Sequence, residues 1–131
     1  MNILLVDDSK TMRNIQKKTL AALGDVQFSE AGDGVEALKV IAAAAQKFNI
    51  ILVDWNMPNM DGITLIRKIR ETDKATPLVM ATTEAEKGRI LDALKAGVNN
   101  YVVKPFTPDL LIEKVKQTLA KASTLPQAIA A

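Results

Sequence analysis

The sequence alternates between two kinds of apolar segment, and this alternation limits the folds that the chain can adopt. Short apolar runs rich in β-branched residues predict strands, and longer segments with apolar residues every three or four positions predict amphipathic helices. Five runs alternate with five helical segments, which predicts an α/β domain with a parallel sheet and helices on both faces. The runs lie at residues 3–6, 26–29, 50–53, 78–81 and 101–103.

The polarity of each run indicates its place in the sheet. Runs 3–6, 50–53 and 78–81 are almost wholly apolar, as expected for strands that are buried on both faces, whereas run 26–29 is more polar and is predicted at an edge. In the helical segments, Ile15, Leu91 and Leu94 belong to the periodic apolar sets.

The boundaries of the domain follow from the same pattern. Gly24 and Gly97 follow the first and fourth helical segments and are predicted as helix C-caps. A chain of 131 residues is long enough for one domain with a real core. We expect residues 1–122 to form that domain and residues 123–131 to be a frayed or loosely docked tail.

The composition excludes several classes of function. The chain contains neither cysteine nor histidine, so disulfides, thiolate metal sites, zinc chemistry and imidazole catalysis are excluded. The formal net charge is +2 with acids and bases interleaved, which argues against a nucleic-acid-binding face. No apolar run approaches the ~18 residues of a membrane span. The first residues already belong to a predicted strand, so we expect no signal peptide. We therefore expect a cytoplasmic protein with no membrane insertion.

Polar residues follow four of the predicted strands at the point where each strand ends. The carboxyl ends of parallel strands lie at one edge of the sheet, where open α/β sheets bind their ligands. Residues that are distant in the sequence should therefore meet in one site. They are Asp7, Asp8, Asp54, Thr82 and Lys104.

Three carboxylates in one site need a counter-charge. Two carboxylates ~4–5 Å apart repel by about 3–4 kcal/mol at an effective dielectric constant of ~20. Lys104 supplies one positive charge, and the all-oxygen ligands suit a divalent ion such as Mg²⁺. Asp54, at the tip of the predicted central strand, is the candidate nucleophile because aspartate carboxylates can form aspartyl phosphates. Asp8 or Ser9 could instead serve as a helix N-cap.

Four motifs in this order resemble the receiver domain of two-component response regulators: "VDDS" (6–9), "DWNMPNMDG" (54–62), "TT" (82–83) and "KPF" (104–106). The similarity covers roughly residues 2–121. It implies a flavodoxin-like, doubly wound (βα)5 fold with a five-stranded parallel sheet in the order 2-1-3-4-5. The segments 54–62 and 99–108 are most similar to the single-domain chemotaxis regulators of that family.

The resemblance implies a role for each matching residue. Asp7 and Asp8 would bind Mg²⁺ together with Asp54 and the backbone carbonyl of Asn56. Asp54 would be the phosphoacceptor, and Thr82 and Lys104 would contact the phosphoryl group. The resemblance also implies a cis Lys104–Pro105 peptide bond.

The resemblance also concerns residues outside the phosphorylation site, which would change conformation on activation or contact a partner protein. Tyr101 matches the aromatic residue that moves inward on activation, and Glu84 with Asn56 matches the chemotaxis subgroup. We expect Trp55 to lie exposed beside the site. Thr83 stands where many relatives carry alanine, beside the expected phosphoryl pocket.

The resemblance implies a phosphorylation-activated chemotaxis switch rather than an enzyme with separate substrates. Its phosphodonor would be a histidine kinase, its target a flagellar motor switch protein, and a phosphatase is a further candidate partner. We expect a monomer.

The sequence leaves three alternatives to this switch to be compared with its residues. A phosphorelay intermediate or phosphate sink would use the same residues. An aspartate-nucleophile phosphatase of the haloacid dehalogenase type is disfavoured, because Asn56 stands where that class has an aspartate that delivers a proton. A flavodoxin-like cofactor binder is disfavoured because "DDSK" (7–10) places negative charge where phosphate would bind.

Overall fold

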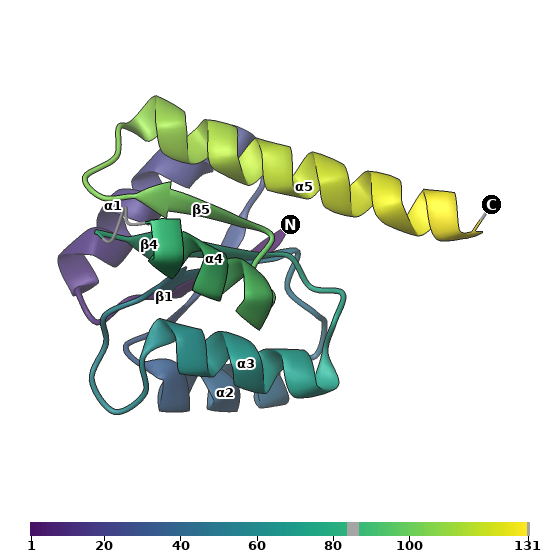
Figure 1. The fold of residues 1–131 in the computed structure, drawn as a ribbon. Coiled ribbons are helices and arrows are strands. Elements are labelled where there is room, and N and C mark those ends of the chain that lie inside the picture. Colours follow the sequence, from purple (N-terminus) through teal and green to yellow (C-terminus); the bar gives the residue numbers. More distant parts are fainter. Residues whose placement is uncertain (84–86, 131) are drawn as a thin grey trace.

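A parallel sheet forms the centre of the molecule (Figure 1). The computed structural model describes the backbone of residues 1–83 and 87–130 and the side chains of residues 1–83 and 89–121. The five strands have the order β2-β1-β3-β4-β5 and all pair in parallel, so the predicted doubly wound fold is confirmed. The strands are β1 (Asn2–Val6), β2 (Gln27–Ala31), β3 (Ile50–Asp54), β4 (Leu78–Thr82) and β5 (Asn100–Val103).

Helices cover both faces of the sheet. Helices α1 and α5 pack on one face, and α2, α3 and α4 pack on the other (Figure 1). A short 3-10 helix, η1, follows α1 directly. The bounds are α1 (Lys10–Leu20), η1 (Ala21–Leu23), α2 (Gly34–Ala43), α3 (Gly62–Thr72), α4 (Lys87–Ala96) and α5 (Pro108–Ala130).

The central strands feed two cores because successive side chains of a strand point to opposite faces. From β1, Leu4 and Val6 enter the core under α2, α3 and α4, whereas Ile3 and Leu5 enter the core under α1 and α5. Strands β3 and β4 are buried at every position, as their apolar sequences predict. Strand β2 lies at an edge and is only partly buried, which confirms its predicted place.

The sequence predicted where helices end more accurately than which of their side chains are buried. Gly97 follows α4 with a φ of +119°, as predicted for a C-cap, whereas Gly24, with a φ of +113°, ends the 3-10 helix η1 and Ala21 is the C-cap of α1. Ile15, however, is 47% exposed, and Gln16 beside it is buried. Apolar spacing identifies a helix, but it does not decide which of two neighbouring side chains faces the core.

The last helix is longer than expected. Helix α5 continues to Ala130, past residue 122, where the sequence analysis placed the end of the domain and the start of a frayed tail. In Figure 1 its C-terminal part extends beyond the body of the molecule. Within the described part of the chain, no helix is both long enough and apolar enough to cross a membrane.

The loop between β3 and α3 depends on a glycine. The Gly62 amide donates to the Trp55 carbonyl over 2.8 Å and so closes the loop. A Cβ atom at Gly62 would lie 2.3 Å from the backbone oxygen of Asp54. Only a residue without a side chain lets α3 begin this close to the end of β3.

The turn between α3 and β4 depends on a carboxylate. Asp73 accepts hydrogen bonds from the amides of Ala75 (2.9 Å) and Thr76 (3.0 Å) and from the Thr76 hydroxyl. Burial raises the pKa of Asp73, but these hydrogen bonds outweigh it, and the pKa falls from 3.8 to about 2. The charged form therefore stabilises the native turn.

Gly62→Ala is expected to lower the free energy of unfolding by about 3 kcal/mol, because the added methyl group overlaps backbone atoms that cannot move aside cheaply. Chemical denaturation measures the change. Gly32→Ala is the control, since a Cβ atom there meets its nearest neighbour at 3.5 Å, an ordinary contact distance. Equal losses in the two variants would contradict the steric explanation.

Asp73→Asn is expected to lower the free energy of unfolding by about 2 kcal/mol at pH 7. The folded-state pKa is depressed, so the stabilisation is present above pH 3.8 and is lost as the pH falls through about 2. Urea denaturation at pH 7, 4 and 2 should show the difference from wild type shrinking with acidity. Asp25→Asn, at an exposed position, is the control. A difference that did not change with pH would assign the loss to packing instead of charge.

Candidate functional site

The carboxyl ends of four strands bring the polar residues singled out in the sequence to one edge of the sheet. Val6, the last residue of β1, pairs with Val53, so Asp7 follows beside Asp54. Asp54 ends β3, Thr82 ends β4, and Lys104 follows β5. The folded chain thus brings five residues from the ends of four strands to one edge of the sheet.

Three carboxylates lie close together at this edge. The oxygens that Asp7, Asp8 and Asp54 can offer to an ion all lie within 4.8 Å of one another. Asp7 is 1% exposed and Asp54 is 7% exposed, whereas Asp8 is at the surface. The cluster is therefore open on the side of Asp8 and buried at its base.

Lys104 provides the positive charge at the base of the cluster. Its Nζ lies 3.1 Å from Asp7 Oδ2 and 3.1 Å from Asp54 Oδ1. Burial lowers the pKa of Lys104, but the two carboxylates outweigh burial and the pKa is raised. The lysine is therefore charged at neutral pH, and it bridges Asp7, which follows β1, and Asp54, which ends β3.

The surroundings of Asp54 disfavour its charged form and raise its pKa. Burial raises its pKa most, and the neighbouring Asp7 and Asp8 raise it further. Lys104 lowers it by its charge and hydrogen bond without cancelling the increase. A second cation near Asp54 would therefore stabilise its ionised form.

The donor set fits a magnesium ion. Three carboxylates and one ammonium leave two negative charges, the charge that a divalent cation would neutralise. All the ligands on offer are oxygens, which hard cations such as Mg²⁺ prefer. Asn56 is exposed in the loop that follows Asp54, close in sequence to the cluster.

Local hydrogen bonds set the two acid-bearing loops. Ser9, not Asp8, is the N-cap of α1, and its Oγ accepts from the Met12 amide over 3.1 Å. The Ser9 amide donates to Asp7 Oδ1 over 2.9 Å. Asp61 caps α3 in the same way by accepting from the Thr64 amide. The carboxylate of Asp8 is thus left for the site.

The remaining predicted residues differ in their surroundings. Thr82 is 2% exposed at the end of β4, while Thr83 beside it is exposed. Tyr101 on β5 is half-buried, with Lys114 Nζ 5.2 Å from its ring centroid. The Lys104–Pro105 peptide bond is cis, as the resemblance implied. Glu84 lies outside the described residues.

Trp55 contradicts the expectation of exposure. Its side chain packs in the core under α3 and α4, and the residue is only 4% exposed. Arg89 of α4 covers it, with Cζ 5.1 Å from the ring centroid, a cation–π contact. Trp55 is followed by polar residues in the sequence, which suggested an exposed loop position although its side chain is part of the core.

Two arginines at this edge were missed by the sequence analysis. Arg89 contacts Trp55, and Arg13 donates to the backbone carbonyl of Asp7 and to Glu30. Arg13 and Lys17 are four residues apart on α1, so the sequence could have suggested one shared acidic partner. It offered no signal that Arg13 also reaches the loop that carries the acids.

Comparison with known proteins gives consistent results. The model of the response regulator receiver domain matches residues 3–116. Chemotaxis protein CheY1 of Helicobacter pylori is 49% identical over 121 residues, 91% of this chain and 97% of that protein. Chemotaxis protein CheY of Pseudomonas aeruginosa is 43% identical over 125 residues, 94% of this chain and 99% of that protein.

Solved structures agree with the sequence relatives. The structure of Vibrio cholerae chemotaxis protein CheY4 has a TM-score of 0.81 at 33% identity, covering 89% of this chain and 97% of that chain. A CheX–CheY–BeF3–Mg²⁺ complex from Borrelia burgdorferi has a TM-score of 0.84 at 28% identity, covering 89% and 87%. Since the family model spans most of the chain and relatives this similar cover nearly all of it, the protein belongs to the response regulator receiver domain family, among relatives that are CheY chemotaxis proteins.

Proposed function

We propose that this protein is a phosphorylation-activated switch of bacterial chemotaxis that accepts a phosphoryl group from a histidine kinase on Asp54. The observation that carries the proposal is the position of Lys104, whose ammonium lies 3.1 Å from both Asp7 and Asp54. A lysine held beside a buried carboxylate suits the transfer of a phosphoryl group, which depends mainly on positioning and charge neutralisation.

The acidic cluster would hold the metal ion for this transfer. Receiver domains bind Mg²⁺ at an acidic cluster, which here is formed by Asp7, Asp8 and Asp54. The backbone carbonyl of Asn56 would complete the protein ligands. Bound there, Mg²⁺ would neutralise negative charge on the acids and on the phosphoryl oxygens.

The transfer step is a displacement at phosphorus. A carboxylate oxygen of Asp54 attacks the phosphorus of the donor phosphohistidine and forms a P–O bond. The P–N bond breaks, its electron pair stays on the imidazole nitrogen, and that nitrogen takes up a proton. Lys104, already paired with Asp54, remains within reach of the new phosphoryl oxygens, and the Thr82 hydroxyl would bind another of them.

The response would pass from Thr82 to an exposed face. Thr82 ends β4 and Tyr101 lies on the adjacent β5. A shift of Thr82 toward the phosphoryl group would let Tyr101 move inward. On the same side, α4 exposes Leu91 and Leu94, each 45% accessible, an apolar pair that suits partner binding.

The proposed partners follow from this face and from the relatives. The target would be a flagellar motor switch protein, and a phosphatase would end the signal. Similarity to chemotaxis proteins supports this choice. The chain would act as a monomer in the cytoplasm, with chemistry confined to its own phosphorylation and dephosphorylation.

Asp54→Asn tests the phosphoacceptor. In wild type, Mg²⁺ and then beryllium fluoride should each change the fluorescence of Trp55, because Trp55 directly follows the acceptor. In the variant the beryllium fluoride change should disappear, since the amide lacks the carboxylate oxygen that forms the adduct. Asp109→Asn, in the first turn of α5, serves as the control and should respond fully. A full response of Asp54→Asn would mean that another residue is the acceptor.

Lys104→Ala tests the coupling of the site to the partner face. The variant keeps all the proposed metal ligands, so Mg²⁺ binding should remain within a few-fold of wild type. Beryllium fluoride should no longer raise its affinity for a motor switch peptide, because the lysine that senses the phosphoryl group is gone. Fluorescence anisotropy of a labelled peptide measures this, with Lys10→Ala, at an exposed position, as the control.

The wild-type peptide measurement also separates the proposed output from its alternative. If beryllium fluoride leaves wild-type affinity unchanged while the Asp54 adduct forms, the chain serves as a phosphorelay intermediate or phosphate sink instead.

A further inference from the structure

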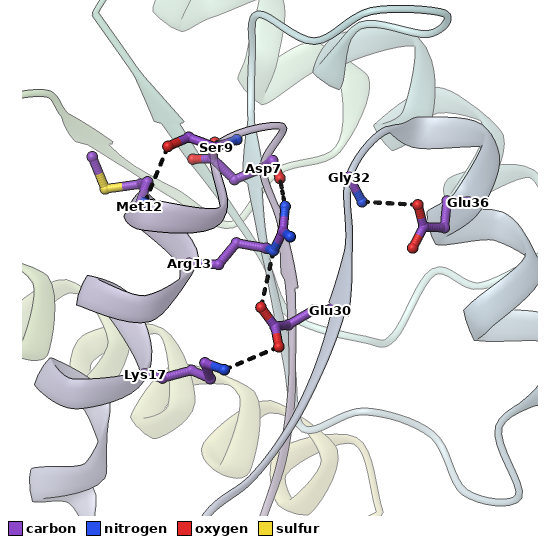
Figure 2. Close-up of polar contacts among 8 residues, drawn as sticks. All are labelled: Asp7, Ser9, Met12, Arg13, Lys17, Glu30, Gly32 and Glu36. Atoms are coloured by element: carbon purple, nitrogen blue, oxygen red, sulfur yellow. Dashed lines mark hydrogen bonds and ion pairs between the residues drawn. The ribbon is translucent and has the colours of Figure 1, made fainter.

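Arg13 connects the acid-bearing loop to the neighbouring strand. Figure 2 shows its guanidinium between the backbone of Asp7 and the side chain of Glu30. Arg13 Nε donates to Glu30 Oε1 over 2.9 Å, and Nη1 donates to the Asp7 carbonyl oxygen. The Arg13 side chain is 16% exposed, Glu30 is 34% exposed and Asp7 is buried, so the contact with Asp7 is the better shielded of the two.

The arrangement of Glu30 leaves Arg13 free for this second contact. An arginine beside a carboxylate often binds both of its oxygens. Here Lys17 takes the other oxygen, with Nζ 3.0 Å from Glu30 Oε2 (Figure 2). Glu30 thus fixes the direction of the guanidinium, and the remaining donors of Arg13 reach the loop.

Every polar group of Asp7, in its backbone and its side chain, forms a hydrogen bond. Its amide donates to the Ala31 carbonyl over 3.1 Å, its carboxylate accepts from Ser9 and Lys104, and its carbonyl accepts from Arg13. The Asp7 carbonyl and the Asp8 amide belong to one planar peptide unit. The bond from Arg13 therefore sets the plane from which Asp8 projects.

Asp8 depends on this backbone because its side chain has no other support. Among the described residues its carboxylate has no hydrogen bond and no ion pair, and the residue is exposed. Its oxygen nevertheless lies within 4.8 Å of those of Asp7 and Asp54. The direction of the backbone is what keeps it there.

We propose that Arg13, oriented by Glu30, is a positioning residue of the cation site that holds the Asp7–Asp8 peptide so that Asp8 faces Asp7 and Asp54. This inference rests on the proposed function, because it assumes that Asp7, Asp8 and Asp54 bind Mg²⁺. Outer groups that orient metal ligands commonly change metal affinity by about 10- to 100-fold when they are removed.

Lys17 allows a matched control. It contacts Glu30 as Arg13 does but donates to no atom of the acid-bearing loop. Arg13→Met and Lys17→Met each remove one cation from Glu30, and methionine keeps a similar apolar stem in each case. If the contacts with Glu30 only attach α1 to β2, both substitutions should have the same effect. If Arg13 also orients Asp8, only Arg13→Met should weaken Mg²⁺ binding.

The experiment measures the dissociation constant of Mg²⁺ by isothermal titration calorimetry, with magnesium chloride and no phosphodonor. Arg13→Met is expected to bind Mg²⁺ about tenfold more weakly than wild type, and Lys17→Met within twofold of wild type. Glu30→Gln retains Arg13 but loosens its orientation, so its affinity should fall between the two. Denaturation in the presence of a chelator checks that each variant is folded, and Glu30→Gln carries the test if Arg13→Met does not fold.

The outcomes separate this inference from the function on which it rests. Failure of wild type to bind millimolar Mg²⁺ would overturn the proposed function. Wild-type binding with unchanged affinity in both Arg13→Met and Glu30→Gln would overturn the positioning role alone. Equal weakening in Arg13→Met and Lys17→Met would also overturn it, since pinning of α1 to β2 would then explain the effect.

Discussion

The ammonium of Lys104 between Asp7 and Asp54 is the contact on which the functional edge depends. A charge buried without a partner destabilises a fold by several kcal/mol, and here two carboxylates lie at the ends of neighbouring strands. Because β4 lies between β3 and β5, Lys104 reaches across the end of β4 to meet them. The Lys104 side chain thus links the ends of β1 and β3. Its charge offsets the cost of burying the Asp7 and Asp54 carboxylates.

The rest of the edge is organised by bonds between side chains and backbone. Ser9 and Asp61 begin the helices that follow β1 and β3, and Arg13 holds the carbonyl of Asp7. These contacts leave the carboxylates of Asp7, Asp8 and Asp54 directed at a common point. The loops themselves therefore orient the carboxylates, and such preorganisation lowers the cost of binding a ligand.

The fold and the meeting of the acids could be predicted from the sequence because both follow from periodicity. Strands 3–6, 50–53 and 78–81 are apolar throughout, and parallel strands must end at one edge. The burial of Trp55 and the exposure of Ile15 could not be predicted, since they depend on how α4 and α1 pack against the sheet. The hydrogen bond from Arg13 to Asp7 could not be predicted either, because Arg13 donates to a backbone carbonyl. Every residue type has that carbonyl, so the identity of residue 7 does not indicate the contact.

The hydrogen bond from the Gly62 amide to the Trp55 carbonyl has a consequence for how this edge can diverge. The bond holds residue 62 against the end of β3, where an added Cβ atom would overlap the backbone oxygen of Asp54. Any side chain at position 62 would therefore press on the strand end that carries the Asp54 carboxylate. Sequence change along this edge is therefore constrained more tightly at the backbone of residue 62 than at exposed loop side chains such as Asn56 and Asn59.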